Sequence, residues 1–184
     1  RSIDLDARLA NLGLIVPEVQ GPLTLSGTAT QDATGYALDI SGNGPGGISG
    51  TVAGRVASGF GTADLAIRGT GQAGLANLFI SPRSASGRVG FDLQLAGPFR
   101  LTSLSGRVTL ADGRVADPGT GLSVQGIEAT GQLASGTLQL AATGGLSSGG
   151  RVRVDGPVGL TRPQTADLAI QLDGVRLYDP ELYD

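Results

Sequence analysis

The sequence predicts an all-β protein built as one long sheet of mostly antiparallel strands with a single apolar face. The first observation is a short apolar/polar alternation that restarts after a glycine or a Gly-Pro step. The second is a composition of 32 glycines and 40% hydrophobic residues in 184 residues, which is typical of many strands joined by tight turns. Because successive side chains of a strand point to opposite faces, each alternating segment has one aliphatic and one polar face.

The expected strands follow one another along the whole chain. Alternation is clearest at residues 3–6, 23–27, 63–69, 91–98, 152–157 and 167–172. Turn or strand-breaking signals lie at 21–22, 42–47, 97–98, 117–119, 144–145, 149–150 and 156–157. At about 12 residues for each strand and its turn, we expect on the order of 13 to 15 strands. Two segments, 75–80 and 10–16, alternate least; the first fits a single helical turn or a buried strand.

The composition excludes several classes of function. Cys, His, Met and Trp are absent and only 4% of residues are aromatic, so the apolar face consists of Leu, Val, Ile and Ala. Without His or Cys, zinc and most transition-metal sites are excluded, and we expect neither a metal nor a cofactor. The formal net charge is −3 and the arginines form no cluster with aromatics, which argues against nucleic-acid binding.

Two motifs resemble catalytic signatures without their chemistry. Residues 69–74 match G-x-G-x-x-G, but Pro82 leaves too little room for the helix that a dinucleotide site requires. Residues 145–149 match G-x-S-x-G, yet no histidine or lysine is present to take the serine proton. A pair of carboxylates brought together by folding would suit glycoside hydrolysis, but aromatics to stack a sugar are scarce. We therefore predict no enzymatic activity.

The aliphatic face itself has two interpretations that the alternation does not separate. It fits the core of a closed β-sandwich or β-helix, which needs no ligand. It also fits an open groove for acyl chains, because each CH₂ group that leaves water contributes ~0.8 kcal/mol. In the groove interpretation, the predicted lining residues are Leu65, Ile67, Phe91, Leu93, Leu95, Val108, Leu110, Leu138, Leu140, Val152, Val154, Leu168, Ile170 and Leu172.

Several segments, in their order and spacing, resemble one known family. These are residues 76–83, 86–98, 104–108, 114–118 and 173–183. Together they resemble the C-terminal region of the TamB family, the translocation and assembly module subunits, and most closely its alphaproteobacterial members. The family is AsmA-like and is grouped with bridge-like lipid transfer proteins. The resemblance covers most of residues 76–184.

The resemblance implies a fold, a location and partners. Its fold is the β-taco, a curled and mostly antiparallel sheet with an open apolar concave face. Because the sequence begins inside an alternating segment, we expect residues 1–184 to be a single fragment of a larger protein. The resemblance implies that this fragment is a β-taco and that the larger protein is a periplasmic protein of a Gram-negative bacterium, anchored in the inner membrane. The implied partners are a TamA-like outer-membrane barrel of the Omp85 type and phospholipid acyl chains. The implied function is that of a periplasm-spanning scaffold whose groove carries phospholipid between the inner and outer membranes and so supports outer-membrane biogenesis. The alternatives are a chaperone surface for nascent β-strands of autotransporters and outer-membrane proteins, and an inert structural or adhesin-like domain.

Overall fold

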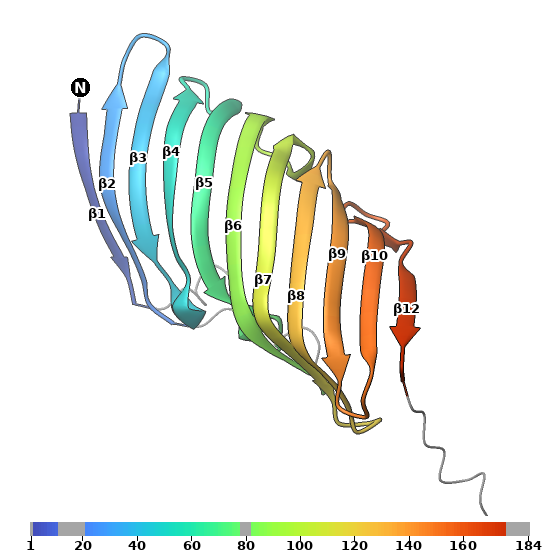
Figure 1. The fold of residues 1–184 in the computed structure, drawn as a ribbon. Helices are drawn as coiled ribbons and strands as arrows, with labels where there is room; N and C mark the ends of the chain where they lie inside the picture. Colours follow the sequence, from blue (N-terminus) through green and yellow to red (C-terminus); the bar gives the residue numbers. More distant parts are fainter. Residues whose placement is uncertain (1, 11–20, 78–81, 176–184) are drawn as a thin grey trace, which may run out of the picture.

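A single antiparallel sheet makes up the protein (Figure 1). The structure, a computed structural model, describes residues 2–10, 21–77 and 82–175. Short 3₁₀ helices span Pro45–Gly47, Ala73–Ala76 and Leu101–Ser103. The strands are β1 (Ser2–Leu9), β2 (Leu23–Gln31), β3 (Gly35–Asn43), β4 (Ser49–Ala57), β5 (Thr62–Gln72), β6 (Ser84–Pro98), β7 (Leu104–Asp117), β8 (Leu122–Ala134), β9 (Thr137–Leu146), β10 (Arg151–Gly159), β11 (Thr165–Ala166) and β12 (Ala169–Asp173).

The sheet is open at both ends in the described part of the chain. Eleven of its twelve strands follow sequence order from β1 to β11, and β12 pairs with residues 151–155 of β10, whereas β11 pairs with residues 158–159. The strands bend along their length, so the sheet forms a trough whose long axis crosses the strands (Figure 1). The predicted fold class, an all-β curled antiparallel sheet, is confirmed.

In the described residues, no second layer closes a core over the apolar face of the sheet. Among the described residues, no large side chain is fully buried, and the buried cluster comprises only Val56, Ala63, Leu65 and Leu95. Leu38, Val52, Ile67 and Leu104 are partly buried against this cluster. A closed sandwich would bury whole rows of side chains between two sheets. The open-sheet interpretation of the alternation is therefore the correct one.

The number of strands in the described residues, 12, is lower than the 13 to 15 expected. Some of the expected strand ends lie inside strands. Gly144-Gly145 lies within β9 and Gly156-Pro157 within β10, whereas Gly97 and Pro98 are the last two residues of β6, which runs for 15 residues. Pairing continues through Gly156-Pro157, because Pro157 lies opposite Gln139.

Four glycines allow neighbouring strands to approach closely in mid-strand. Each has a positive φ, between 131° and 157°, that L side chains rarely adopt, and a Cβ at each would overlap a carbonyl oxygen of the next strand. Glycine kinks of this kind bend a sheet, so they contribute to the curvature of the trough. The glycine and carbonyl pairs are Gly27 with Asp39, Gly54 with Asp64, Gly106 with Asp92 and Gly156 with Asp167.

The ambiguous segments are only partly described. The 3₁₀ helix Ala73–Ala76 accounts for the start of the segment 75–80, in agreement with a helical turn, whereas residues 78–81 lie outside the described residues. Most of 10–16 and the end of the segment 173–183 also lie outside them. Within the described ranges, the structure contains no helix with the length and apolarity that a bilayer crossing requires.

Candidate functional site: the concave groove

A continuous apolar row crosses the concave face from β1 to β10. In each strand pair, the residues opposite one another point to the same face. When these pairs are followed from strand to strand, they form a row that contains no polar side chain. Because neighbouring strands lie about 4.8 Å apart, the groove along this row is on the order of 50 Å long. The members of the row are Leu5, Gly27, Ile40, Val52, Ile67, Leu93, Gly106, Leu133, Leu138 and Val158.

The predicted groove residues that belong to strands lie on this same face, whereas Leu168 precedes β12 and belongs to no strand. Leu65 pairs with Leu95, and Ile67 pairs with Leu93. Toward the other end of the trough, the predicted residues of β7, β9, β10 and β12 join the same rows through small residues of the strands between them. The connecting pairs are Leu110 with Ala129, Ala129 with Ala142, Ala142 with Val154, Val154 with Ile170, and Val152 with Leu172.

The degree of exposure varies along the groove. Leu65 and Leu95 are buried in its centre, with 6% and 7% of their surface exposed. At the β12 end, Ile170 and Leu172 are exposed to 64% and 56%. The other predicted residues, apart from the exposed Leu168, are half-buried. An aliphatic surface that stays in contact with water over this length differs from the core of a closed domain.

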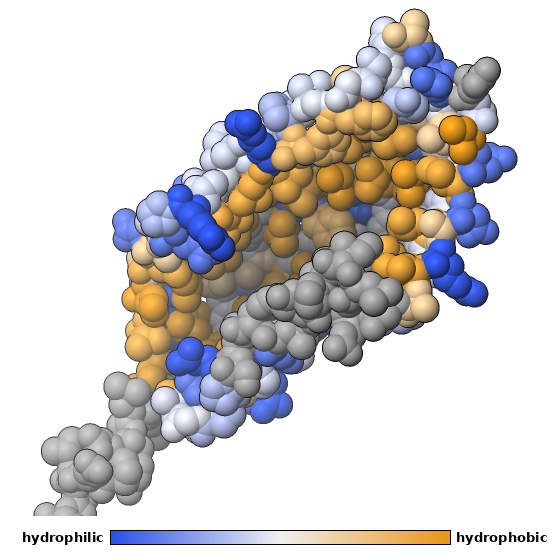
Figure 2. Space-filling model, turned by 180° about the vertical axis from the view of Figure 1, so that it is seen from behind, coloured by the Kyte–Doolittle hydropathy of each residue, from blue (hydrophilic) through white to orange (hydrophobic). Residues whose placement is uncertain are grey.

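Figure 2 shows the hollow of the trough from behind the view of Figure 1. Hydrophobic residues line its interior, and hydrophilic residues lie along its margins. One apolar hollow within it has a volume of about 190 Å³ and is lined by residues of β2 to β6, among them Leu25, Val52 and Phe91. Gly50 on β4 lies opposite Gly42 on β3 and Gly69 on β5. The side chains of Leu25 and Phe91 lie over Gly42 and Gly69, in the space that a Cβ would take.

The alternation in the sequence did not identify several residues that lie in the groove. The predicted set contains none from β1 to β4 or from β8, although those strands contribute to the same face. The signal was present, since Leu38-Asp39-Ile40 and Val52-Ala53-Gly54 alternate like the other strands. Interior glycines shorten the apolar runs there and conceal the pattern. The missed residues include Leu5, Leu25, Leu38, Ile40, Val52, Val56, Leu104, Ile127 and Leu133.

The convex face is polar and bears cross-strand ion pairs. Arg68 on β5 lies opposite Asp92 on β6, and its Nε is 3.0 Å from the carboxylate. Arg88 and Asp112 are 3.6 Å apart, and both side chains are largely exposed. Exposed pairs of this kind contribute little to stability, about 0–1 kcal/mol each. They show that the convex face of β5, β6 and β7 is in contact with solvent.

Two carboxylates have lowered pKa values, and both lie at strand ends rather than in the groove. The Arg55 guanidinium, followed by the backbone N–H and the hydroxyl of Thr34, holds the pKa of Asp32 far below its ordinary value. A hydrogen bond from Arg83, together with the N–H of Gly119, lowers the pKa of Asp117. Both groups remain ionised at neutral pH and stabilise turns, so neither is suited to act as a general base.

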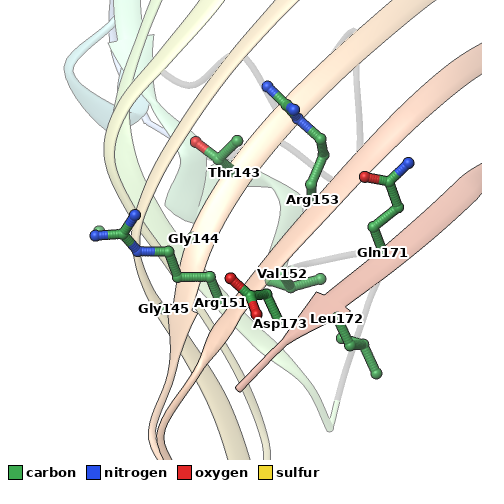
Figure 3. A pocket seen from close by; sticks show the side chains of 10 residues that line it. Thr143, Gly144, Gly145, Arg151, Val152, Arg153, Gln171, Leu172 and Asp173 are labelled. Atoms are coloured by element: carbon green, nitrogen blue, oxygen red, sulfur yellow. The ribbon is translucent and has the colours of Figure 1, made fainter. Parts of the chain in front are cut away.

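A second hollow, of about 600 Å³, lies at the end of the sheet around β9, β10 and β12. Figure 3 shows the polar side chains that line this hollow. The guanidinium groups of Arg151 and Arg153 extend in different directions. Val152 and Leu172 point away from these polar groups. Arg153 is engaged by Asp155 at 3.6 Å. The polar groups do not converge on a common centre, so this hollow does not form a catalytic arrangement.

The motifs that resemble catalytic signatures have structural roles. In the G-x-G-x-x-G motif, Gly69 to Gln72 belong to β5 and a 3₁₀ helix follows. In the G-x-S-x-G motif, Ser147 accepts a hydrogen bond from the N–H of Ser123 at 3.1 Å and links two strand ends. The described ranges contain no group of three or more His, Cys, Asp or Glu residues that is placed to hold a metal ion.

Comparison of the chain with family models, with curated proteins and with solved structures gave no match.

Proposed function

We propose that this chain is part of a periplasmic scaffold whose apolar groove carries phospholipid between the inner and outer membranes of a Gram-negative bacterium. The observation that supports this proposal is the uninterrupted apolar row from β1 to β10. A conduit has to hold its cargo about equally well at every position, because one deep pocket would trap it. A uniform aliphatic lining without a fixed polar anchor meets that condition.

The energetics of the groove suit an acyl chain. Each CH₂ group that leaves water contributes ~0.8 kcal/mol, and an alkyl chain has no hydrogen bonds to satisfy. The groove, on the order of 50 Å long, is about three times the depth of one leaflet's hydrocarbon layer, which is half of the ~30 Å bilayer core. It therefore has room for acyl chains at several successive positions.

The sequence resemblance to the TamB family supports the same function and supplies the setting. We propose the partner that this family implies, a TamA-like barrel of the Omp85 type in the outer membrane. The proposal involves no reaction, metal or cofactor. Transport along the trough would need only differences in lipid occupancy or a coupled partner at its ends.

Photo-crosslinking on β6 tests the proposal. A photoreactive residue is placed at Leu93 on the groove face or at Gln94 on the convex face, and the chain is irradiated with vesicles of phosphatidylethanolamine and phosphatidylglycerol. Because neighbouring residues of a strand point to opposite faces, the Leu93 probe is expected to capture phospholipid and the Gln94 probe is not. Equal capture at both positions, or capture at neither, would contradict the proposal.

A second candidate is a chaperone surface that accepts a nascent β-strand. It is favoured by the two outermost strands, since in the described residues β1 pairs only with β2 and β12 pairs only with β10. Strand acceptance requires main-chain hydrogen bonds at such an edge, whereas acyl chains require only the apolar wall. Capture of a strand-derived peptide in place of lipid at Leu93 would make this candidate the better one.

A further inference from the structure

One rim of the trough exposes aromatic side chains and arginines. This rim, the aromatic rim, consists of the connections 32–34, 58–61, 99–103, 135–136 and 160–164, which join consecutive strands at the same end of the trough (Figure 1). Neighbouring connections are in contact, because the N–H of Ser58 donates to the carbonyl of Thr34 and the N–H of Leu160 donates to the carbonyl of Gly136.

Aromatic and aliphatic side chains are exposed along the aromatic rim. Phe60, Phe99 and Leu101 are exposed to 63%, 53% and 38%. Thr62 pairs with Pro98, so the connections that hold these residues are neighbours. Phe60 stacks on Tyr36 with ring centroids 5.2 Å apart, and Tyr36 lies opposite Val56 on the groove face. The apolar lining of the groove thus continues onto the rim.

Phe60 adopts a backbone conformation that favours glycine. Its φ is 53°, in the left-handed region that bulky residues rarely occupy, although glycines flank it on both sides. Strain of this kind persists where the side chain that it positions matters. Here it places the ring against Tyr36 at the mouth of the groove.

The connections of the aromatic rim carry an excess of positive charge. Its connections contain Arg100 and Arg162, both exposed, and one carboxylate, Asp32, which is engaged by Arg55. The whole chain has a formal net charge of −3. On the opposite rim, the described connections contain one arginine, Arg83, and it is paired with Asp117 at 3.0 Å. Among the described connections, arginines outside an ion pair therefore lie on the aromatic rim.

We propose that the aromatic rim binds the phosphate-bearing headgroups of lipids whose acyl chains lie in the groove, and that it favours anionic headgroups. Aromatic side chains prefer the level of the lipid headgroups, and arginines close to an anionic lipid surface contribute about 1 kcal/mol each, which corresponds to a roughly 5-fold change in affinity. This inference rests on the proposed function and adds a headgroup preference to it.

A competition between two lipids tests the inference. The full chain is incubated with vesicles that contain equal amounts of phosphatidylglycerol and phosphatidylcholine, and the bound lipid is quantified by mass spectrometry. The expected result is enrichment of phosphatidylglycerol by the wild-type chain. The double substitution Arg100→Gln/Arg162→Gln is expected to lower this enrichment by on the order of 5-fold for each arginine, with the total bound lipid unchanged.

A matched control separates the rim from the overall charge. Arg107→Gln/Arg114→Gln removes the same charge from exposed positions of β7, where Arg107 lies opposite Asp92 on the convex face. The control is expected to retain the enrichment. Lipid bound without headgroup preference, or an equal loss in the control, would overturn the inference and leave the proposed function intact. No lipid bound by any variant would overturn both.

Discussion

Gly54 on β4 lies so close to the carbonyl oxygen of Asp64 on β5 that a Cβ at position 54 would overlap this oxygen. The Cα of Leu65, the residue paired with Gly54, would be 3.0 Å from the same Cβ. The φ of Gly54 is 142°, which L side chains rarely adopt. One strand therefore bends against the next at a position that only glycine can occupy, and the same relationship recurs along the trough.

The first prediction is that Gly54→Ala destabilises the sheet. The alanine would have to adopt a strained φ and push β4 away from β5, which costs about 1–3 kcal/mol for the backbone alone. Urea unfolding followed by far-UV circular dichroism measures the loss. Gly59→Ala is the control, because nothing lies within 4 Å of a Cβ there. Equal stability of the two variants would contradict the bend-point role of Gly54.

The second prediction concerns Asp32 and Arg55. The folded state lowers the pKa of Asp32, so the contribution of this carboxylate to stability is fully present above its ordinary pKa of 3.8 and is lost as the pH falls toward the lowered value. Asp32→Asn keeps the oxygen that accepts from Thr34 and Gly35 but removes the charge. It is expected to lower the melting temperature at pH 7, by an amount that shrinks below pH 4.

The partner substitution Arg55→Gln checks this assignment. If the Arg55–Asp32 pair is the main cause of the lowered pKa, the double variant is expected to melt close to either single variant at pH 7. Thermal melts of the four proteins at several pH values provide the measurement. A deficit for Asp32→Asn that stays constant from pH 7 to pH 3 would mean that the pair does not account for the shift.

The third prediction distinguishes the centre of the groove from its end. Leu65 is 6% exposed in the buried cluster, whereas Ile170 on β12 is 64% exposed. Leu65→Arg would bury an unpaired charge and is expected to cost about 3–5 kcal/mol, while Ile170→Arg is expected to change the free energy of unfolding by less than about 1 kcal/mol. Urea midpoints of the two variants measure the difference. A large loss in Ile170→Arg would indicate that β12 is packed on its groove face.

The alternation was sufficient to predict the face of the strand residues that it identified, but it predicted neither the groove residues of β1 to β4 and β8 nor the shape of the sheet. Alternation identified Leu93 and Asp92 as neighbours on opposite faces, because the period of a strand is fixed by its backbone. It did not distinguish a closed core from an open groove, since both require the same apolar face. That difference depends on whether a second layer covers Leu93, which is a long-range property.

The ends of the strands could not be predicted reliably from the local sequence either. Gly97-Pro98 and Gly156-Pro157 both have the composition of turns, yet β6 ends at Pro98 whereas β10 continues through Gly156-Pro157 and pairs there with β9. Gly156 has a positive φ of 148°, so it bends β10 without ending it. Only the cross-strand partners decide between a bend and a turn.

The fourth prediction is that the groove binds an apolar fluorescent dye and that detergent displaces it. A monomeric protein usually exposes no contiguous apolar patch larger than about 300–600 Å², and the row from Leu5 to Val158 runs across almost the whole sheet. Leu93→Arg places a charge in this row and is expected to lower the fluorescence of the bound dye. Gln94→Arg adds the same charge to the convex face and is expected to leave it unchanged, because residue 94 points away from the groove. A dye signal that is absent from the wild-type chain, or that falls equally in both variants, would mean that the concave face is not open to apolar ligands in solution.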